Sequence, residues 1–172
     1  MKHQITRRIE IDAGHRIPLH ESKCKNIHGH RYVIEATVKG ELASDGAEAG
    51  MVMDFGFIKA EMVAAIDRVY DHALILWRGD EVYKAMQKSG QAYGAGGGIV
   101  GQGYELVSMV PYGNIVVLDV IPTAENLARV WFDALAPRID RVSEGNAELD
   151  HIVVRETPNC SARYPIALHE AV

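Results

Sequence analysis

The chain has 172 residues, of which 48% are apolar and 24% are charged, and its formal net charge at pH 7 is −5. These values are typical of one globular domain with a hydrophobic core. They argue against a broad nucleic-acid surface, which needs a basic face, but they leave room for a local basic patch that binds a small anion.

Two strands that carry histidine at one end of their apolar face are predicted near the N-terminus. Residues 5–15, ITRRIEIDAGH, alternate so that His15 shares a face with Ile5, Ile9, Ile11 and Ala13. Residues 28–40, HGHRYVIEATVKG, alternate in the same way, with His28 and His30 on the face of Tyr32, Ile34, Ala36 and Val38. The polar segment between the two strands predicts a loop.

Two helices and two further strands complete the regular pattern. Residues 54–72 predict a helix with Asp54 as its N-cap, and residues 122–139 predict a second helix that Thr123 caps. Their buried stripes are expected to be Ile58, Met62, Ile66 and Val69 in the first helix, and Leu127, Val130, Trp131 and Ala134 in the second. Residues 148–158 predict a strand, and residues 160–166 predict a short last strand.

The stretch 78–113 fits this pattern least well. Residues 81–89, EVYKAMQKS, predict a short helix, and the glycines of residues 93–105 predict a flexible surface loop. This glycine-rich segment does not contain the Lys-Ser/Thr pair of a phosphate-binding loop. It also has no predicted strand directly before a G-x-G-x-x-G motif. Residues 114–120, NIVVLDV, predict an added edge strand. We therefore expect one domain over residues 1–172, with an insertion at about 78–113.

Nothing in the sequence predicts export or membrane insertion. The N-terminus MKHQITRRIE has no apolar signal region, and the longest apolar stretch, IVVLDVI, is short and contains Asp119. Cys24 and Cys160 lie far apart and make a poor disulfide framework. We therefore expect a cytoplasmic protein with at least one working thiol and no membrane contact.

The three histidines at the strand ends suggest a metal site. In an extended strand, the side chains of residues i and i+2 point the same way, with their Cβ atoms about 7 Å apart. His28 and His30 can therefore bind the same ion. By its parity His15 can join them once the two strands pair, and Gly29 leaves no side chain on the reverse face. Three imidazoles with an open fourth position are typical of catalytic zinc. The alternative is an H-x-H pair that makes ordinary hydrogen bonds.

Cys24 can be interpreted in two ways. It lies in the predicted loop four residues before His28, where its thiolate could be a fourth ligand that closes a structural zinc site. Lys23 and Lys25 flank it, and because nearby cations generally favour a thiolate, this setting suits a base or nucleophile equally well. The spacing alone leaves both interpretations open.

Two further groups have the residue types of acid–base and binding chemistry. Asp71 and His72 end the first predicted helix, and a carboxylate beside histidine can orient an imidazole that shuttles protons with a thiol. Simple helix capping by a cationic His72 is the alternative. Glu156 shares a face with apolar strand residues, where a carboxylate needs a partner. It could bind an amino-pyrimidine edge through two parallel hydrogen bonds, or it could pair with Arg155 or Arg163.

Together these segments resemble the 6-pyruvoyl-tetrahydropterin synthase / 6-carboxy-tetrahydropterin synthase family, whose fold is the tunnelling fold (T-fold). The matching segments occur in the family's order and span almost the whole chain. They are AGH at 13–15, CKNIHGH at 24–30, GMVMDF at 50–55, YDH at 70–72, PTAEN at 122–126 and RET at 155–157. The stretch 78–113 lies outside the pattern.

The resemblance implies an α+β T-fold, a four-stranded antiparallel sheet with two main helices on one face. Such a sheet has two exposed edges, and closure with neighbouring subunits into a β-barrel removes them. The family assembles as trimers that form a twelve-stranded barrel and stack as hexamers. A homo-oligomer with sites at subunit interfaces is therefore expected.

The resemblance also implies roles for individual residues. Zinc would be held by His15, His28 and His30, and Cys24 would be the catalytic base with Asp71 and His72 as its relay. Glu156 would anchor the pterin ring, with contributions from Thr123 and Thr157. Lys23, Lys25 and Arg16 are candidates for binding the triphosphate of the substrate, 7,8-dihydroneopterin triphosphate, or are solvated surface charges.

Within the family, the C-x3-HGH spacing resembles the bacterial 6-carboxy branch of queuosine (7-deazaguanine) synthesis. The expected activity is a zinc-dependent 6-carboxytetrahydropterin synthase, a lyase that releases acetaldehyde and triphosphate. One alternative is a 6-pyruvoyl-tetrahydropterin synthase, which eliminates triphosphate without C–C cleavage. The other is a non-catalytic zinc-binding assembly protein of the same fold.

Overall fold

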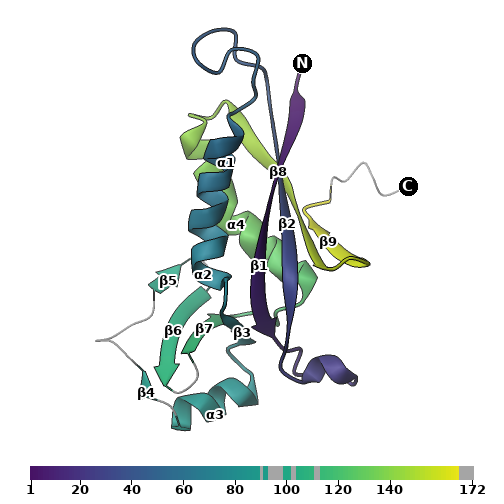
Figure 1. Ribbon diagram of the computed structural model, residues 1–172, viewed down its shortest axis with the longest axis vertical. Helices are drawn as coiled ribbons and strands as arrows, with labels where there is room; N and C mark the ends of the chain where they lie inside the picture. The colour runs from purple at the N-terminus through teal and green to yellow at the C-terminus, as the bar shows by residue number, and fades with distance from the viewer. Residues whose placement is uncertain (90, 93–98, 102–103, 111–112, 167–172) are drawn as a thin grey trace.

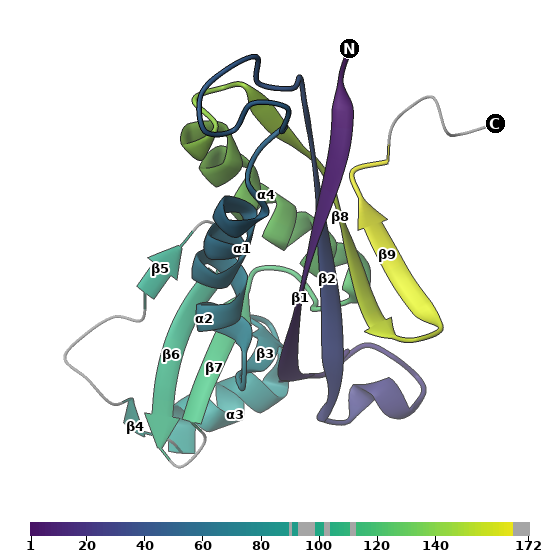
Figure 2. The same cartoon turned by 45° about the horizontal axis from the view of Figure 1, so that its top comes forward.

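A mixed β-sheet organises the molecule, and the computed structural model describes residues 1–89, 91–92, 99–101, 104–110 and 113–166. In these residues the sheet has nine strands in the order β4-β6-β7-β3-β1-β2-β8-β9, with β5 paired to β6 (Figure 1). Helices α1 and α4 cover one face of β1, β2 and β8 (Figures 1 and 2). None of the described helices has the length and apolarity needed to cross a membrane.

One half of the sheet is the antiparallel unit that the alternating sequence predicted. It consists of β1 (His3–His15), β2 (His28–Gly40), β8 (Ala147–Thr157) and β9 (Cys160–Tyr164). Each strand pairs antiparallel with the next along this order. The register places His15 opposite His28 and Ala13 opposite His30, so the histidines of the two strands meet at one end of the sheet.

The described sheet extends beyond the four antiparallel strands and the one added edge strand that were expected. β3 (Leu74–Trp77) joins β1 in parallel, β7 (Gly113–Leu118) joins β3 in parallel, and β6 (Tyr104–Val110) is antiparallel to β7. β4 (Gln91–Ala92) and β5 (Ile99–Gly101) both pair with β6. β3 is a continuous four-residue apolar run, and such a run shows no alternation that would identify a strand.

The same region corrects two smaller predictions. β7 was expected as an edge strand, but it lies between β3 and β6. Residues 99–101 and 104–105 were expected in a loop and are strand residues, while residues 93–98 and 102–103 lie outside the described part of the chain. The helix predicted at residues 81–89 is confirmed as α3 (Glu81–Ser89).

Both main helices begin where the sequence predicted. Asp54 accepts a hydrogen bond from the Gly56 N–H at the start of α1 (Phe55–Met62), which continues through a π-helical turn (Val63–Asp67) into α2 (Arg68–Tyr70). Thr123 accepts from the Asn126 N–H at the start of α4 (Ala124–Val142). Ala134 is only partly buried, and Leu135 and Ile139 are buried in α4 instead.

Three aromatic residues connect the hydrophobic core, which lies between the sheet and the helices, to the histidines. Trp131 of α4 packs edge-on against Tyr32 of β2, with ring centroids 6.1 Å apart, and against Tyr70 at 5.4 Å. Tyr32 in turn contacts the rings of His15 and His30, at 5.8 and 5.7 Å. All three aromatic side chains are fully buried, so the histidines rest on a rigid hydrophobic layer.

Candidate metal centre and active site

His15, His28 and His30 converge on one point. One ligand atom from each ring can be chosen so that all three lie within 4.8 Å of one another. The ring centroids are 4.5 Å apart for His15 and His28, 5.2 Å for His15 and His30, and 5.0 Å for His28 and His30. The convergence follows from the β1–β2 register, which brings the last residue of one strand beside the first residues of the other.

Hydrogen bonds to carbonyl groups fix which nitrogen of two of these rings can bind a metal. Nδ1 of His15 lies 2.8 Å from the backbone oxygen of Pro122, and Nδ1 of His28 lies 2.8 Å from that of Asn26. A carbonyl oxygen only accepts, so each Nδ1 carries the hydrogen and each Nε2 keeps its lone pair. This arrangement is typical of metal-binding histidines.

Burial favours the neutral imidazoles that a metal needs. Desolvation lowers the pKa of His15 and of His30 below the ordinary histidine value. Nε2 of His15 and of His30 are buried and have no hydrogen-bond partner among the described residues. Buried polar atoms without partners are costly, and a bound cation would satisfy them. The three imidazoles therefore fit a zinc ion, for which histidine nitrogen is a preferred ligand.

Cys24 is not a member of this group. It lies in the one-turn 3-10 helix η1 (Lys23–Lys25) and is half-buried, while Lys23 and Lys25 are exposed. The backbone oxygen of Cys24 accepts a hydrogen bond from the Ile17 N–H, which ties η1 to the end of β1. Because the described ligand group contains only the three histidines, the geometry favours an open site over a closed His3Cys site.

Glu156 lies beside the histidines, on the face that the strand alternation predicted. Its Oε1 atom is 3.4 Å from Nε2 of His15 and 4.0 Å from Nε2 of His30. The guanidinium groups considered as alternative partners form other ion pairs, Arg155 with Glu35 at 3.3 Å and Arg163 with Asp150 at 3.9 Å. The carboxylate is partly exposed next to the histidine group, where it can contact a ligand.

Asp71 and His72 form an oriented pair. Oδ2 of Asp71 lies 2.8 Å from Nδ1 of His72, and Oδ1 accepts from the Asp12 N–H at 2.9 Å. The Asp12 N–H and His72 lower the pKa of Asp71, which keeps its carboxylate charged. His72 has a left-handed φ of 57°, and its N–H donates to the Asp12 oxygen. These contacts leave Nε2 of His72 pointing away from Asp71, as proton transfer requires.

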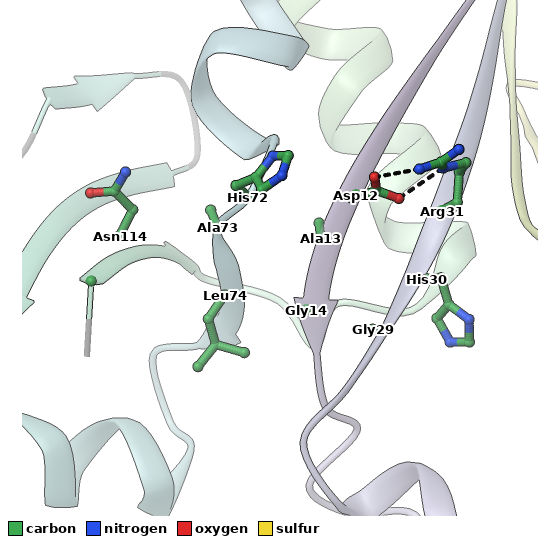
Figure 3. Close-up of a pocket in the computed structure, with 11 residues that line it drawn as sticks. Asp12, Ala13, Gly14, Gly29, His30, Arg31, His72, Ala73, Leu74 and Asn114 are labelled. Carbon is green, nitrogen blue, oxygen red and sulfur yellow. Dashed lines mark hydrogen bonds and ion pairs between the residues drawn. The ribbon is translucent and has the colours of Figure 1, made fainter. Parts of the chain in front are cut away.

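One pocket of about 610 Å³ lies beside His72, next to the ends of β1 and β2 that carry the histidines. Its lining includes His30, His72 and the ion pair of Asp12 and Arg31, and the ring of His30 points away from His72 (Figure 3). Gly14 and Gly29 are cross-strand partners that line it with bare backbone. A Cβ added to Gly29 would lie 3.1 Å from the Ala13 oxygen, a tight contact that would require the neighbouring backbone to shift by a few tenths of an ångström.

The remaining predicted residues have local roles in the chain. Thr123 caps α4, and its hydroxyl oxygen lies 3.4 Å from the Asn126 nitrogen. The Thr157 hydroxyl accepts from the Asn159 N–H in the β8–β9 turn. Arg16 lies with Nε 3.4 Å from Oδ2 of Asp80, whose side chain is fully buried at the start of α3.

Several residues that support the site were not predicted. Tyr32 was assigned only to the apolar face, although it contacts two histidine rings, and burial raises the pKa of its hydroxyl. The Pro122 oxygen is a backbone atom, for which the sequence carries no signal. The ion pair of Asp12 and Arg31 follows from the β1–β2 register, in which these residues are direct partners, and could have been found by aligning the two predicted strands.

Comparisons with known proteins agree with this picture. A family model described as 6-pyruvoyl tetrahydropterin synthase matches residues 4–166. A 6-carboxy-5,6,7,8-tetrahydropterin synthase of Rickettsia bellii is 37% identical, over 90% of this chain and 94% of its own. One of Aquifex aeolicus is 29% identical over 95% and 98%. The crystal structure of an uncharacterized protein from Wolinella succinogenes shares the fold, with a TM-score of 0.77 and 23% identity over 97% and 99% of the two chains.

Proposed function

The chain belongs to the 6-pyruvoyl tetrahydropterin synthase family, and on this basis we propose that it is a zinc-dependent 6-carboxy-5,6,7,8-tetrahydropterin synthase. Its substrate would be 7,8-dihydroneopterin triphosphate, which it converts to the 6-carboxy product, acetaldehyde and triphosphate for queuosine synthesis. The observation that carries the proposal is the three-histidine group with Glu156 beside it. The name of the Rickettsia bellii relative favours the carboxy product over the pyruvoyl product.

The histidines would hold the zinc. Bound there, the ion supplies a Lewis acid that orients the side-chain oxygens of the substrate and polarises a carbonyl group. The chain contributes a fixed set of donors, because the Pro122 and Asn26 oxygens hold the rings of His15 and His28 in one orientation. Tyr32 and the core beneath it keep the rings from moving apart.

Cys24 and His72 would move the protons. A thiolate can remove the proton from a carbon next to a carbonyl group, and an imidazole held by a carboxylate can pass it on. Asp71 fixes the ring of His72 for this task. His72 and His30 line one pocket, and within this chain the ring of His30 points away from His72 (Figure 3).

Glu156 would bind the pterin ring. Its carboxylate can accept two parallel hydrogen bonds from an amino-pyrimidine edge, and its position beside the histidines sets the ring next to the reacting side chain. Thr123 and Thr157 are proposed to contribute further hydrogen bonds. Lys23 and Lys25 are exposed cations near Cys24, and with Arg16 they are the proposed contacts of the triphosphate.

The proposed enzyme is a homo-oligomer, a trimer or hexamer closed into a barrel, in the cytoplasm. Among the described residues, Gly14 and His15 are the only residues of β1 that pair with β3, and β9 ends the sheet. Most of the outer edge of β1 and the outer edge of β9 therefore lack a strand partner. Unpaired edges are aggregation sites that closure into a barrel removes. A neighbouring subunit could then supply some of the residues at each site.

The test is identification of the products. Zinc-loaded protein is incubated with 7,8-dihydroneopterin triphosphate, and the pterin product and acetaldehyde are identified by mass spectrometry. Acetaldehyde together with 6-carboxytetrahydropterin supports the proposal. A pyruvoyl product without acetaldehyde would instead assign the chain to the pyruvoyl synthases. Absence of turnover in protein that holds zinc would favour the non-catalytic alternative.

A further inference from the structure

A groove far from the histidine group has an apolar lining that the proposed chemistry does not use. It measures about 410 Å³ and lies between the first residues of β1, the loop before α1 and the first turn of that helix. Leu42, Met51 and Phe55 line it and are 44%, 44% and 50% exposed. Its β1 residues, His3–Ile5, are ten to twelve positions from the metal-site end of the strand, about 33–40 Å along it. Clustered exposed apolar residues indicate a binding surface.

The strand registers show where β9 ends relative to this groove. Tyr164 of β9 is opposite Ile152, Ile152 is opposite Ala36, and Ala36 is opposite Arg7 of β1. β9 therefore ends at the level of Arg7 and runs toward the N-terminal end of β1. A segment that continued in this direction would pass the level of Ile5 and then of His3, which line the groove.

The chain that follows β9 has the composition to fill the groove. Ile166 is 63% exposed, and the sequence continues for six residues beyond it, ALHEAV. Ile166 and Leu168 are two positions apart, so in an extended segment they point to the same side. Their apolar side chains match the apolar lining of Leu42, Met51 and Phe55.

We propose that the groove binds the C-terminal segment, residues 166–172, of a neighbouring copy of this chain. The inference rests on the proposed barrel. The outer edges of β1 and β9 are at opposite sides of the antiparallel unit, so in a closed barrel β9 continues the sheet onto the β1 of a second copy. Strand direction alternates across this unit, and an antiparallel β9–β1 contact brings the end of β9 to the start of the neighbouring β1. The segment would then fasten adjacent copies together at the end of the sheet away from the metal site.

Disulfide trapping tests the proposal on the full chain. Met51→Cys and Leu168→Cys are combined in a Cys160→Ser background, which removes the exposed native thiol. The matched control combines Leu168→Cys with Leu19→Cys, another exposed apolar position, which lies beyond the opposite end of β1. After mild oxidation, we expect covalently joined chains on a denaturing gel for the Met51 pair and single chains for the control. Deletion of residues 167–172 should also raise the concentration at which the oligomer dissociates by about tenfold or more.

Three results would overturn the proposal. The first is an equal yield of covalently joined chains in the Met51 and Leu19 variants, and the second is no covalent joining in either. The third is a disulfide between the two cysteines of one chain, found by peptide mass analysis. Light scattering of the unmodified protein separates this failure from failure of the proposed function. An oligomer that binds zinc and turns over substrate, but shows no trapping, rejects only the docked segment. A monomer rejects the docked segment and the barrel together.

Discussion

Nδ1 of His15 lies 2.8 Å from the backbone oxygen of Pro122, a contact between residues 107 positions apart in the chain. It joins the last residue of β1 to the residue that precedes the N-cap of α4. The orientation of a proposed metal ligand therefore depends on where α4 begins. Groups that hold metal ligands in this way typically contribute 10- to 100-fold to metal affinity.

Substitution of the N-cap should consequently weaken metal binding. Thr123→Ala removes the acceptor for the Asn126 N–H and loosens the first turn of α4. The neighbouring Pro122 oxygen would then be held less firmly in its position beside His15. We expect zinc affinity to fall by up to about tenfold, measured by chelator competition in the absence of pterin. Thr123→Ser keeps the hydroxyl acceptor and should bind zinc with the same affinity as the unmodified protein. Equal loss in both variants would show that the cap does not act through Pro122.

Cys24 and His72 should behave as one acid–base unit. Cys24→Ala and His72→Ala should each lower kcat by about 10²–10⁴, with little change in the affinity for a substrate-like pterin. Residues that act together are not additive, so the double variant should be scarcely slower than the slower single variant. Steady-state kinetics with direct pterin binding measures this. Full additivity would mean that the two residues serve separate steps.

Asp71 should make the stability of the protein depend on pH in the acid range. Its pKa is lowered in the folded state by the Asp12 N–H and by His72, so the unfolded chain binds a proton more readily. The stabilisation is present above the ordinary value of 3.8 and is lost as pH falls through the folded-state pKa. Because the side chain is 34% exposed, solvent screening keeps the effect small.

Urea unfolding of the metal-free protein between pH 5 and pH 3 measures this effect. The free energy of unfolding should fall less steeply with acidification in Asp71→Asn than in the unmodified chain. Asp45→Asn, at an exposed position in the loop before α1, provides a matched control for the loss of one carboxylate. Identical slopes for Asp71→Asn and the unmodified chain would contradict the prediction.

Glu156→Gln should separate pterin binding from metal binding. The substitution removes the anion that receives the pterin edge, in the ground state and the transition state alike, so the Kd of a substrate-like pterin should rise by roughly 10-fold or more. Zinc content should stay at the unmodified level, because the metal group consists of His15, His28 and His30. Calorimetric titration of the zinc-loaded variant provides the measurement. If the variant binds the pterin normally but loses zinc, Glu156 is a metal ligand.

The antiparallel half of the fold and the histidine group could be predicted because they depend on alternation. His15, His28 and His30 share the parity of buried apolar residues, and strand pairing then brings them together. β3 could not be predicted, since a short apolar run next to a helix has no distinguishing period. The parallel pairing of β3 with β1 and β7 depends on tertiary contacts, which no local sequence pattern encodes.

The support for the site was predictable only in part. The pair of Asp71 and His72 could be identified because the residues are adjacent, but their anchoring to Asp12 depends on how α2 meets β1. The carbonyl of Pro122 and the buried carboxylate of Asp80 come from segments distant in sequence from the residues that they contact. The contacts that orient the proposed site are thus mostly long-range.

The central claim is that three histidines form an open zinc site and that Cys24 is not one of its ligands. Metal analysis tests this claim most directly. The zinc content per chain is measured by mass spectrometry of the metal in the unmodified protein, in His28→Ala and in Cys24→Ala. We predict one zinc per chain in the unmodified protein and in Cys24→Ala, and none in His28→Ala. Loss of the zinc from Cys24→Ala would contradict the account, because Cys24 would then be a ligand of a closed site.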